Sequence, residues 1–449
     1  MISWQKRLTE ILGQEQVFTD DATCWAYGGD NSRRLSPPEA VVFAMNTEQV
    51  AKAVDFCAQA GIPLTPRGRG TATTGAAVPA QGGVVLSLER MRQVGEVDAA
   101  ARAVWVEPGV LNAALGEALG QKGFFWPPDP SSAAYCTTGG NIATNAGGPH
   151  TLKYGATRQN VLALEAVTGA GEVIHAGFGV GKTSVGYDLV RLLVGSEGTL
   201  AVVTMALLKL TPKPACRKGL ILAYENTPWC ALALSAIGEK AQPSALEFMD
   251  AASLLLVEKR RPGLVPPGAR AMLLAEADGD EETCENTLKA MELASLNPGR
   301  VFLGRSEDMK SLWGARKALS AALRDIAPLK INEDIVVPLS RLPELLAKTE
   351  VLSSVHGIPV VNFGHGGDGN IHVNLLLDQG QKEAAKSCLD ALFSEVIALG
   401  GTLSGEHGIG ESKKDYLPQA VDAATLGLMK RIKSAFDPQG ILNPGKIFP

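Results

Sequence analysis

Hydrophobic residues in the first 210 positions form short continuous runs that alternate with helical patterns. The run AVVFAMN, at 40–46, predicts a buried strand. The segment TEQVAKAVDFCAQAG follows it with apolar residues at helical spacing, Thr47 at the position of an N-cap and Gly61 where the helix should end. The runs GVVLSL and AVWVEPG predict further strands, and VLNAALGEALG predicts a second helix. The pattern therefore indicates mixed helices and strands with glycine-rich connections.

The pattern changes near Pro212 and Pro214, beyond which glycines become sparser. Strand-like runs such as GLILAYE and AMLLAEAD then alternate with longer helical patterns, of which KEAAKSCLDALFSEVIALGG is the clearest. The last stretch, FDPQGILNPGKIFP, is rich in turn formers and predicts a tail that packs on another part of the chain. We therefore expect a first domain at 1–210, a second domain at 211–405 and a C-terminal segment at 406–449 that packs on the first domain.

Composition narrows the class of protein. The 449 residues are 45% hydrophobic and 20% charged, as in globular proteins, and their number exceeds what one core usually holds. A formal net charge of -5 without a block of like charges argues against nucleic acid as a partner. We expect neither a transmembrane segment nor a secretory signal, because the apolar runs are too short for either. The expected location is cytoplasmic, either free or peripheral to the inner membrane.

Two familiar phosphate motifs are incomplete in this chain. AGFGVGKTS has Ala176 where the phosphate loop requires glycine, and GRGTAT has Thr73 where the dinucleotide fingerprint has its third glycine. For the first of them we favour a surface turn with Lys182 in solvent. The seven cysteines are scattered without a CxxC pair, which suggests neither an iron–sulfur cluster nor a disulfide scaffold.

Two glycine-rich loops are more informative. PRGRGTATTGAAVPAQGGVVLSL and PPDPSSAAYCTTGGNIATNAGG are crowded with Gly, Thr, Ser and Asn. Successive backbone N–H groups that glycine leaves accessible can surround a diphosphate without a lysine. Either loop alone could be an irregular structural connection, because glycine first reports backbone geometry. The two together, followed by VGSEGTLAVVT, favour a bound diphosphate.

Three of the six histidines fall in two short segments, GHGGDGNIHVN and LSGEHGIG. NIHVN alternates like a strand, which places His372 and Asn374 on one face, and the glycines before it allow a bend that brings His365 over His372. With Glu406 from the second segment, the two imidazoles make a three-ligand set that leaves positions open, as in catalytic zinc sites. Manganese or iron would also accept this set. A hydrogen-bonded structural role is the alternative for each histidine.

These segments resemble a known family, the FAD-binding proteins of the vanillyl-alcohol-oxidase type (PCMH-type), in their D-2-hydroxy-acid dehydrogenase branch. The resemblance covers roughly 37–448 and rests on PRGRGT, TTGGNIATNAGG, KYGATRQNVLALE, GYDLVRLLVGSEGTLAVVT, GHGGDGNIHVN, SGEHGIG and FDPQGILNPGKIF. It implies an α+β fold class, with a two-subdomain PCMH-type FAD-binding domain and an α+β FAD-linked oxidase C-terminal domain as the substrate cap. The segment from 406 onward would complete the active site.

The resemblance assigns FAD to positions in the first domain and the tail. Carried over one by one, these are Arg67, Gly68, Arg69, Gly70, Thr71, Gly75, Pro128, Thr138, Gly139, Asn141, Ala143, Asn145, Val203 and Asn443. Members that attach the flavin covalently often have a histidine where RGRGT ends, and this chain has Thr71 there. We therefore expect non-covalent FAD.

The resemblance also gives roles to the histidine segments. His365, His372 and Glu406 would bind a divalent metal, for which zinc is our expectation, and His407 would be the catalytic base. A 2-hydroxy acid could then chelate the metal through its carboxylate and hydroxyl. His407 would take the hydroxyl proton while the C2 hydrogen leaves as a hydride to N5 of the flavin.

The substrate carboxylate needs a further cation, and the resemblance points to Arg316 and Lys330. Arg316 suits bidentate binding of a carboxylate. Ser320 lies one helical turn from Arg316 and could face the same pocket, and we also assign Asn374 to the substrate.

The predicted function is oxidation of a D-2-hydroxy acid, with D-lactate to pyruvate as the first choice. The segment SGEHG, with Gly405, is more similar to the matching segment of lactate and glycolate members than to that of hydroxyglutarate members, which tend to have alanine at the place of Gly405. Glycolate and D-2-hydroxyglutarate remain open. Electrons would pass to a separate acceptor, namely a quinone, a cytochrome, an electron-transfer flavoprotein or oxygen, and family likeness suggests a homodimer. Two other interpretations stay open, a metallohydrolase and a flavin-holding subunit that needs partner chains.

Overall fold

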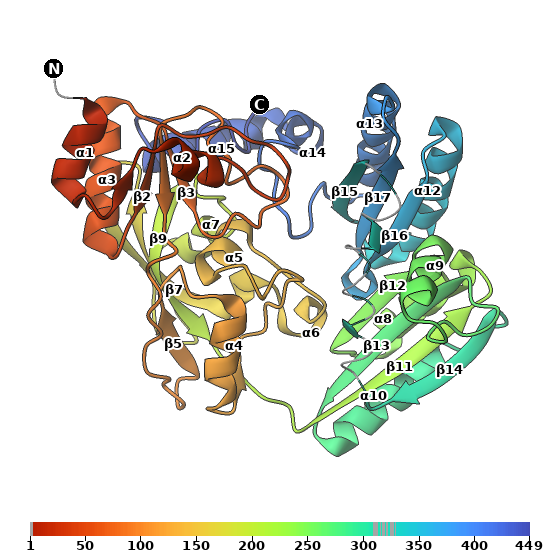
Figure 1. Ribbon diagram of the computed structural model, residues 1–449. Helices are drawn as coiled ribbons and strands as arrows, with labels where there is room; N and C mark the ends of the chain where they lie inside the picture. Colours follow the sequence, from red (N-terminus) through yellow and green to blue (C-terminus); the bar gives the residue numbers. More distant parts are fainter. Residues whose placement is uncertain are drawn as a thin grey trace. The chain divides into compact units, whose positions relative to one another are not determined.

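The chain folds into two compact units, drawn in Figure 1. The computed structural model describes residues 3–308, 313–314, 316, 319, 322–323, 327 and 329–449. The first unit contains Met1–Gly148, Gly155–Lys213 and Glu406–Pro449, and the second contains Pro149–Tyr154 and Pro214–Gly405. The mixture of helices and sheets in both units is the α+β class that the sequence predicts. The sequence pattern did not indicate that 149–154 belong with the second unit.

The first unit begins with a four-stranded sheet in the order β1-β2-β4-β3. The strands are β1 (Val17–Phe18), β2 (Ala40–Phe43), β3 (Leu64–Arg67) and β4 (Val84–Ser87). Both β2 and β3 pair with β4 in parallel, whereas β1 is antiparallel to β2. Since parallel strands need a crossover connection, helix α3 (Thr47–Ala60) links β2 to β3.

Helix α3 corrects one expectation from the sequence. Its N-cap is Asn46, whose side-chain oxygen accepts a hydrogen bond from the backbone N–H of Gln49 at 3.0 Å. Thr47, the expected cap, is already helical, and its hydroxyl donates to Glu165 at 2.6 Å. The expectation was wrong because asparagine caps at least as well as threonine and stands one position earlier. Gly61 ends the helix in the left-handed conformation, as expected.

A second, antiparallel sheet of the first unit has the order β5-β9-β7-β8. Its strands are β5 (Ala103–Val106), β7 (Val161–Thr168), β8 (Val173–Gly177) and β9 (Ala201–Lys209). Val167 and Val202 from this sheet share a core with α3 and the first sheet. A short pair joins β6 (Phe124–Phe125) to β10 (Thr211–Pro212). The described helices are α1 (Trp4–Leu12), α2 (Asp21–Tyr27), α3, α4 (Asn112–Gly120), α5 (Thr138–Thr144), α7 (Leu189–Leu193), α14 (Leu417–Ala420) and α15 (Ala423–Phe436).

The end of the chain packs within the first unit. Leu442 forms a parallel bridge with Leu64 of β3, and the N–H of Asn443 donates to the carbonyl of Leu64 at 2.7 Å. Lys433 of α15 donates to the carbonyls of Thr199 at 2.7 Å and Leu442 at 2.8 Å. Figure 1 shows α15, in violet-blue, among elements from the first half of the sequence.

The second unit is built on one antiparallel sheet of seven strands, in the order β14-β11-β13-β12-β16-β17-β15. The strands are β11 (Cys216–Tyr224), β12 (Ala245–Met249), β13 (Ala271–Gly279), β14 (Arg300–Ser306), β15 (Leu329–Val336), β16 (Val360–His365) and β17 (Asn370–Leu377). The helices that are described in full are α6 (Thr151–Tyr154), α8 (Thr227–Lys240), α9 (Ala251–Arg260), α10 (Glu281–Ala294), α12 (Leu342–His356) and α13 (Lys382–Ala398). The central strands are buried along nearly their whole length because helices cover the sheet.

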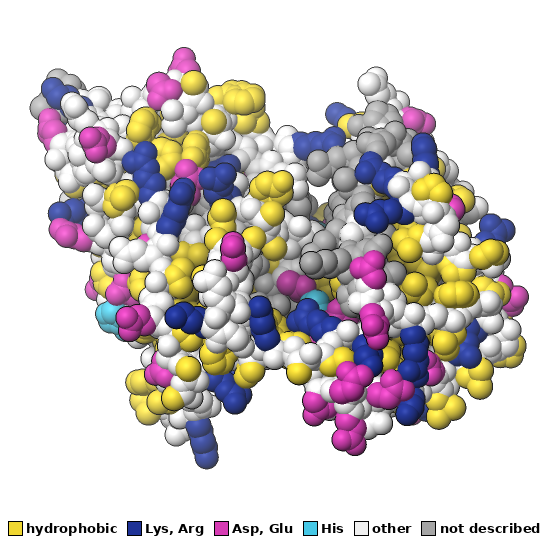
Figure 2. All heavy atoms as spheres, turned by 60° about the horizontal axis from the view of Figure 1, so that its bottom comes forward, with side chains coloured by type: hydrophobic (Ala, Val, Ile, Leu, Met, Phe, Trp, Pro, Cys, Tyr) yellow, Lys and Arg dark blue, Asp and Glu magenta, His cyan; other side chains and the backbone are white. Residues whose placement is uncertain are grey.

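Surface charge is mixed, and Figure 2 shows acidic and basic side chains interspersed on the face that it draws. Among the described residues, no helix combines the length and hydrophobicity that a membrane crossing requires.

Candidate active site

The first glycine-rich loop follows β3, and Arg67 at the end of that strand shapes it. The Arg67 guanidinium is buried and donates to the carbonyls of Gly29 at 2.7 Å and Ala77 at 3.4 Å. A Cβ atom at Gly70 would lie 2.2 Å from the Arg67 side chain, and Gly70 has a φ of 65°. Only glycine therefore fits this position. Arg69, in contrast, is half-exposed and pairs with Glu89 at 3.4 Å.

The backbone of this loop offers a row of hydrogen-bond donors. Within the described part of the chain, the N–H groups of residues 68–76 donate no hydrogen bond, and this row includes the expected positions Gly68, Thr71 and Gly75. The loop is buried from Thr74 to Ala76. Since buried N–H groups are nearly always paired in a working protein, the loop is suited to receive a polar or anionic ligand.

The second glycine-rich loop leads into the short helix α5. Gly139 approaches Pro108 so closely that a Cβ atom would lie 2.5 Å from the Pro108 Cβ. Thr138 donates to the carbonyl of Glu107 at 2.9 Å. Asn145 ends the helix with a φ of 52°, and its side chain accepts from the N–H of Arg158 at 2.9 Å. These contacts fix the loop on the first unit.

Other expected cofactor positions have mainly backbone contacts. The carbonyl of Pro128 accepts from the side chain of Asn112 at 2.9 Å, and that of Ala143 accepts from the N–H of Glu197 at 2.7 Å. Val203 lies on β9, paired with Ala166 of β7. All fourteen expected positions belong to the first unit: Arg67, Gly68, Arg69, Gly70, Thr71, Gly75, Pro128, Thr138, Gly139, Asn141, Ala143, Asn145, Val203 and Asn443.

Two buried asparagines test whether a polar cofactor fits. The side-chain nitrogen of Asn141 and the side-chain oxygen of Asn443 are buried, and neither has a hydrogen-bond partner among the described residues. The Asn443 nitrogen, in contrast, donates to the carbonyls of Ala76 at 2.9 Å and Glu197 at 2.7 Å. The Asn141 nitrogen, the Asn443 oxygen and the N–H groups of 68–76 thus have no hydrogen-bond partner within the described part of the chain. They lie at or beside the positions that the resemblance assigns to FAD. The residues present fit the cofactor.

Glu406 and His407 are the first residues of the last stretch of the first unit. The two side chains are partly buried, with His407 Nε2 at 3.9 Å from Glu406 Oε1. Thr74 of the first glycine-rich loop donates to the carbonyl of His407 at 3.2 Å. The expected base therefore lies on a segment that is attached to the expected cofactor loop.

His365 and His372 lie together in the second unit. Strands β16 and β17 are joined by a one-turn helix at Gly366–Asp368, and their pairing places His372 opposite Phe363. The two imidazole rings are 5.3 Å apart and nearly perpendicular, and ligand atoms of the two side chains lie within 4.8 Å of each other. The structure thus brings together the two histidines that the sequence pairs. Gly369, with a φ of 77°, makes the bend possible, since a Cβ atom there would lie 2.1 Å from the carbonyl oxygen of Val337.

Glu247 is a site residue that the sequence reasoning missed. It lies on β12 and is fully buried, with Oε1 at 2.5 Å from His365 Nδ1 and Oε2 at 2.6 Å from Arg316 Nε. Burial would raise the pKa of Glu247, but the charges of Arg316 and His365 and the hydrogen bond from His365 lower it to about 2. An ionised Glu247 favours the tautomer of His365 that carries its proton on Nδ1, and in that tautomer Nε2 has the lone pair that a metal ligand needs. The acidic residue inside the apolar strand ALEFM was the available signal.

Arg316 is also held by this carboxylate. Its contact with Glu247 is an ion pair without good hydrogen-bond geometry, and its guanidinium lies 4.6 Å from the centre of the Phe363 ring. Within the described part of the chain, the two terminal nitrogens of Arg316 donate no hydrogen bond. They can therefore still form the two-pronged contact with a carboxylate that the sequence predicts.

The other expected substrate residues have different surroundings. Lys330 lies on β15 opposite Leu376 and is partly exposed. Asn374 is fully buried; its side chain accepts from Asn332 at 2.7 Å and donates to the carbonyls of Val361 and His372. The observed contacts of Asn374 thus hold three strands together. Ser320 lies outside the described residues.

Asp334, on β15, is a buried carboxylate beside His372. It lies opposite His372 and is fully buried, with a carboxylate oxygen within 4.8 Å of a His372 nitrogen. It accepts from Asn370 at 2.6 Å and from both the hydroxyl of Ser404 and the N–H of Gly405 at 2.9 Å. Asp334 therefore fixes the chain at the residue that precedes Glu406.

Residues 149–154, which the sequence placed in the first domain, pack within the second unit. His150 Nε2 lies 2.9 Å from Glu276 Oε1, and Tyr154 donates to Asp278 at 2.7 Å. A Cβ atom at Gly367 would lie 2.4 Å from Leu152, so this segment packs directly beneath the turn that follows His365. Sequence periodicity gave no sign of these contacts, because their partners are more than a hundred positions away.

Two family models match the chain. The model described as FAD binding domain matches residues 38–177, and the model described as FAD linked oxidases, C-terminal domain, matches residues 213–447.

Curated relatives match nearly the whole chain. Glycolate oxidase subunit GlcD of Bacillus subtilis is 37% identical over 99% of this chain and 96% of its own length. D-lactate dehydrogenase of Anaerostipes hadrus is 37% identical over 91% and 89%, and D-2-hydroxyglutarate dehydrogenase of Stutzerimonas stutzeri is 34% identical over 98% and 98%.

Solved structures share the fold. A p-cresol methylhydroxylase with substrate bound has a TM-score of 0.84 at 18% identity and covers 99% of this chain and 96% of its own. An alkyldihydroxyacetonephosphate synthase has a TM-score of 0.78 at 17% identity, with coverage of 98% and 84%. At this identity the likeness concerns the fold, and it agrees with the PCMH-type architecture that the sequence resembles.

Proposed function

Since this chain belongs to the FAD-linked oxidases and is an FAD-binding oxidoreductase, we propose that it oxidises a D-2-hydroxy acid with the help of a divalent metal. The named relatives act on glycolate, D-lactate and D-2-hydroxyglutarate, which are all 2-hydroxy acids. D-lactate, converted to pyruvate, is our first choice, with glycolate and D-2-hydroxyglutarate as alternatives.

The observation that carries the proposal is the buried row of Arg316, Glu247 and His365. The Glu247 carboxylate bonds His365 at Nδ1 and at the same time pairs with Nε of Arg316, whose terminal nitrogens donate no hydrogen bond within the described part of the chain. Metal-bound histidines commonly bond a carboxylate through their second nitrogen. A 2-hydroxy acid needs both parts, a metal ligand set for its hydroxyl and a cation for its carboxylate.

The mechanism assigns a task to each group. When bound, FAD supplies the acceptor for two electrons, and the metal polarises the oxygen atoms of the substrate. The N–H groups of 68–76, with Asn141 and Asn443, would hold FAD. The terminal nitrogens of Arg316 bind the substrate carboxylate, and an imidazole nitrogen of His407 accepts the proton of the C2 hydroxyl.

For the metal, we propose His365, His372 and Glu406 as ligands. Two imidazoles and one carboxylate suit zinc, and manganese or iron would accept the same set. Nε2 would be the ligand atom of His365, because Nδ1 faces Glu247 and would carry the proton. Electrons would then leave for a separate acceptor, such as a quinone, a cytochrome or an electron-transfer flavoprotein, since the seven cysteines are free thiols and, among the described residues, none belongs to a group of possible metal ligands.

The substrate can be identified from the colour of the protein under anaerobic conditions. We expect absorption near ~450 nm from oxidised flavin, and we expect D-lactate to bleach it. Glycolate and D-2-hydroxyglutarate should be added to separate samples. Dithionite is the control, because it reduces bound flavin chemically and does not need the substrate site. A protein that remains colourless after FAD is added would contradict the proposal and favour a metallohydrolase.

A second candidate is a flavin-holding subunit that turns over only with partner chains. It is favoured by the relative from Bacillus subtilis, whose name describes it as a subunit. The same experiment separates the two cases. Flavin that dithionite bleaches and that none of the three acids bleaches would support the subunit.

Thr71 predicts how the flavin is attached. We expect the cofactor to leave the protein on denaturation, because threonine offers no imidazole nitrogen for a covalent link at the end of RGRGT. After acid precipitation and centrifugation, the yellow colour should remain in the supernatant. Colour that stays with the precipitated protein would show a covalent bond and overturn this expectation.

A further inference from the structure

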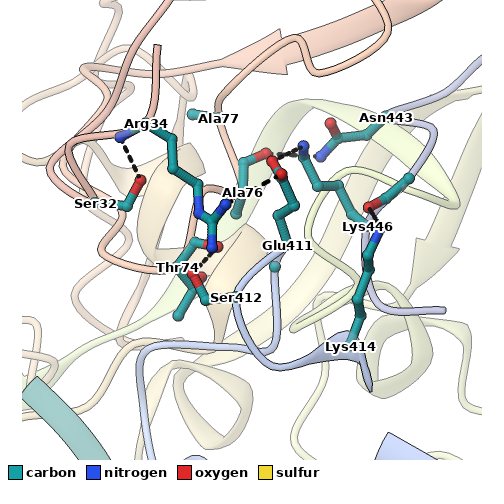
Figure 3. A network of polar contacts seen from close by, with 12 residues as sticks. Ser32, Arg34, Thr74, Ala76, Ala77, Glu411, Ser412, Lys414, Asn443 and Lys446 are labelled. Carbon is teal, nitrogen blue, oxygen red and sulfur yellow. Dashed lines mark hydrogen bonds and ion pairs between the residues drawn. The ribbon is translucent and has the colours of Figure 1, made fainter. Parts of the chain in front are cut away.

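Residues 407–412 of the first unit form an irregular turn that two distant residues hold in place. Glu197 accepts hydrogen bonds from the N–H groups of Ile409 at 2.7 Å and Gly410 at 2.8 Å. The carbonyl of Thr74 accepts from the N–H groups of Glu411 at 2.9 Å and Ser412 at 3.0 Å. The Thr74 hydroxyl donates to the carbonyl of His407 at 3.2 Å. Figure 3 shows Thr74 beside Glu411 and Ser412.

The glycines of HGIG fit this arrangement closely. Gly408 has a φ of 81°, and a Cβ atom there would lie 2.8 Å from Glu197 Oε1. Gly410 has a φ of 54°, and a Cβ atom there would lie 2.4 Å from the carbonyl oxygen of Thr74. A side chain at either position would push the turn away from its anchors. The spacing of the two glycines is therefore explained by the approach of the turn to Glu197 and Thr74.

Glu197 is itself rigidly placed. It is buried and has a φ of 53°, a left-handed conformation that is unfavourable for residues other than glycine. Its N–H donates to the carbonyl of Ala143 at 2.7 Å, and its carbonyl accepts from the Asn443 side chain at 2.7 Å. Burial raises the pKa of its carboxyl group to about 7 in spite of the two N–H donors. A buried acid in a strained conformation needs a compensating role, and the role visible here is to hold the turn.

We propose that Glu197 and Thr74 are positioning residues that hold the turn of His407 so that its imidazole can take the substrate proton. The inference rests on the function proposed above, in which His407 is the base. Thr74 belongs to the loop 68–76, whose N–H groups would hold the cofactor. The cofactor loop and the base are thus fixed to each other within one unit.

The test is a double-mutant cycle between Glu197 and His407, read as the rate of flavin reduction by D-lactate in anaerobic stopped flow. In Glu197→Gln the side chain keeps its shape, but its amide group points a donor at an N–H donor. We expect the rate at saturating substrate to fall about 10- to 100-fold through misplacement of the base. The concentration for half-maximal rate should change by less than about twofold, because substrate binding is untouched. In a His407→Ala background the same substitution should have no further effect.

Glu411→Gln is the matched control, because Glu411 lies on the same turn but bonds the charged side chains of Arg34 at 3.3 Å and Lys446 at 3.4 Å. Figure 3 shows these contacts. This variant should retain the full rate of flavin reduction even if loss of the pair with Lys446 lowers stability, because the backbone N–H of residue 411 still donates to the carbonyl of Thr74. FAD content and reduction by dithionite, measured on every variant, show that the fold and the cofactor are intact. If Glu197→Gln does not fold, Thr74→Val tests the same turn through loss of the hydroxyl alone.

The outcomes separate this inference from the proposed function. If His407→Ala reduces flavin at the full rate, the role of His407 is wrong and the inference falls with it. If His407→Ala is slow while both Glu197→Gln and Thr74→Val are fast, the proposed function stands and the inference is overturned. An equal loss from Glu197→Gln in the presence and absence of His407 would also overturn it, because the effect would not pass through the base.

Discussion

Replacing His407 with glutamine is expected to lower the rate of flavin reduction by substrate about 10²- to 10⁴-fold, the usual contribution of a general base. Glutamine has a similar size and retains hydrogen-bonding groups, but it cannot accept the proton of the C2 hydroxyl near neutral pH. FAD content should be unchanged, since the hydrogen bond from Thr74 of the cofactor loop goes to the backbone carbonyl of residue 407, which the substitution keeps. Anaerobic stopped flow with D-lactate measures the effect directly.

His175 provides the control for this substitution. It lies in the same unit on β8 with a side chain that is 72% exposed. His175→Gln should therefore reduce flavin at the wild-type rate. If His407→Gln were equally fast, another group would have to be the base, and the proposed mechanism would be wrong at this step.

Replacing Glu247 with glutamine is expected to weaken metal binding and to destabilise the second unit. The amide cannot hold the proton on Nδ1 of His365 as a carboxylate does, and loss of such a contact typically lowers metal affinity about 10- to 100-fold. It also leaves the charge of Arg316 buried without its counter-charge, which typically costs about 3–5 kcal/mol. Zinc titration, with metal content after dialysis, measures the first effect, and thermal unfolding measures the second.

Glu285→Gln is the matched control in the same unit. Glu285 also pairs with an arginine, Arg305, at 2.9 Å, but at the surface. Loss of this pair should change stability far less than loss of the buried pair, because solvent screens both charges. Metal affinity should not change. A Glu247→Gln protein that binds zinc as tightly as the wild type would remove the main support for the metal site.

The sequence predicted the elements that depend on neighbouring residues. The strands β2, β4 and β5 and the helices α3, α4 and α13 lie where the hydrophobic patterns place them. The glycines between His365 and His372 correctly indicated a bend that brings the two rings together. The cap of α3 was misplaced by one residue, because Asn46 and Thr47 are both good caps and local sequence does not rank them decisively.

The bonding partners of the site residues could not be predicted from the sequence. Glu247 bonds a histidine 118 positions away, and Glu197 bonds an N–H group 212 positions away. Glu197 stands in the segment VGSEGTLAVVT, but nothing in that segment tells which backbone atoms its carboxylate will face. The attachment of 149–154 to the second unit depends likewise on Glu276 and Asp278 of β13.

The sequence by itself thus determined the local elements, the glycine-rich bends and, through resemblance, the class of chemistry. Side-chain period and backbone conformation are set within a few residues, so such features can be read along the chain. Only the tertiary structure decided that Glu247 serves both Arg316 and His365, and that Glu197 and Thr74 hold the turn of His407. The physical reason is that buried polar groups must be paired, and the fold alone determines which distant group comes within bonding distance.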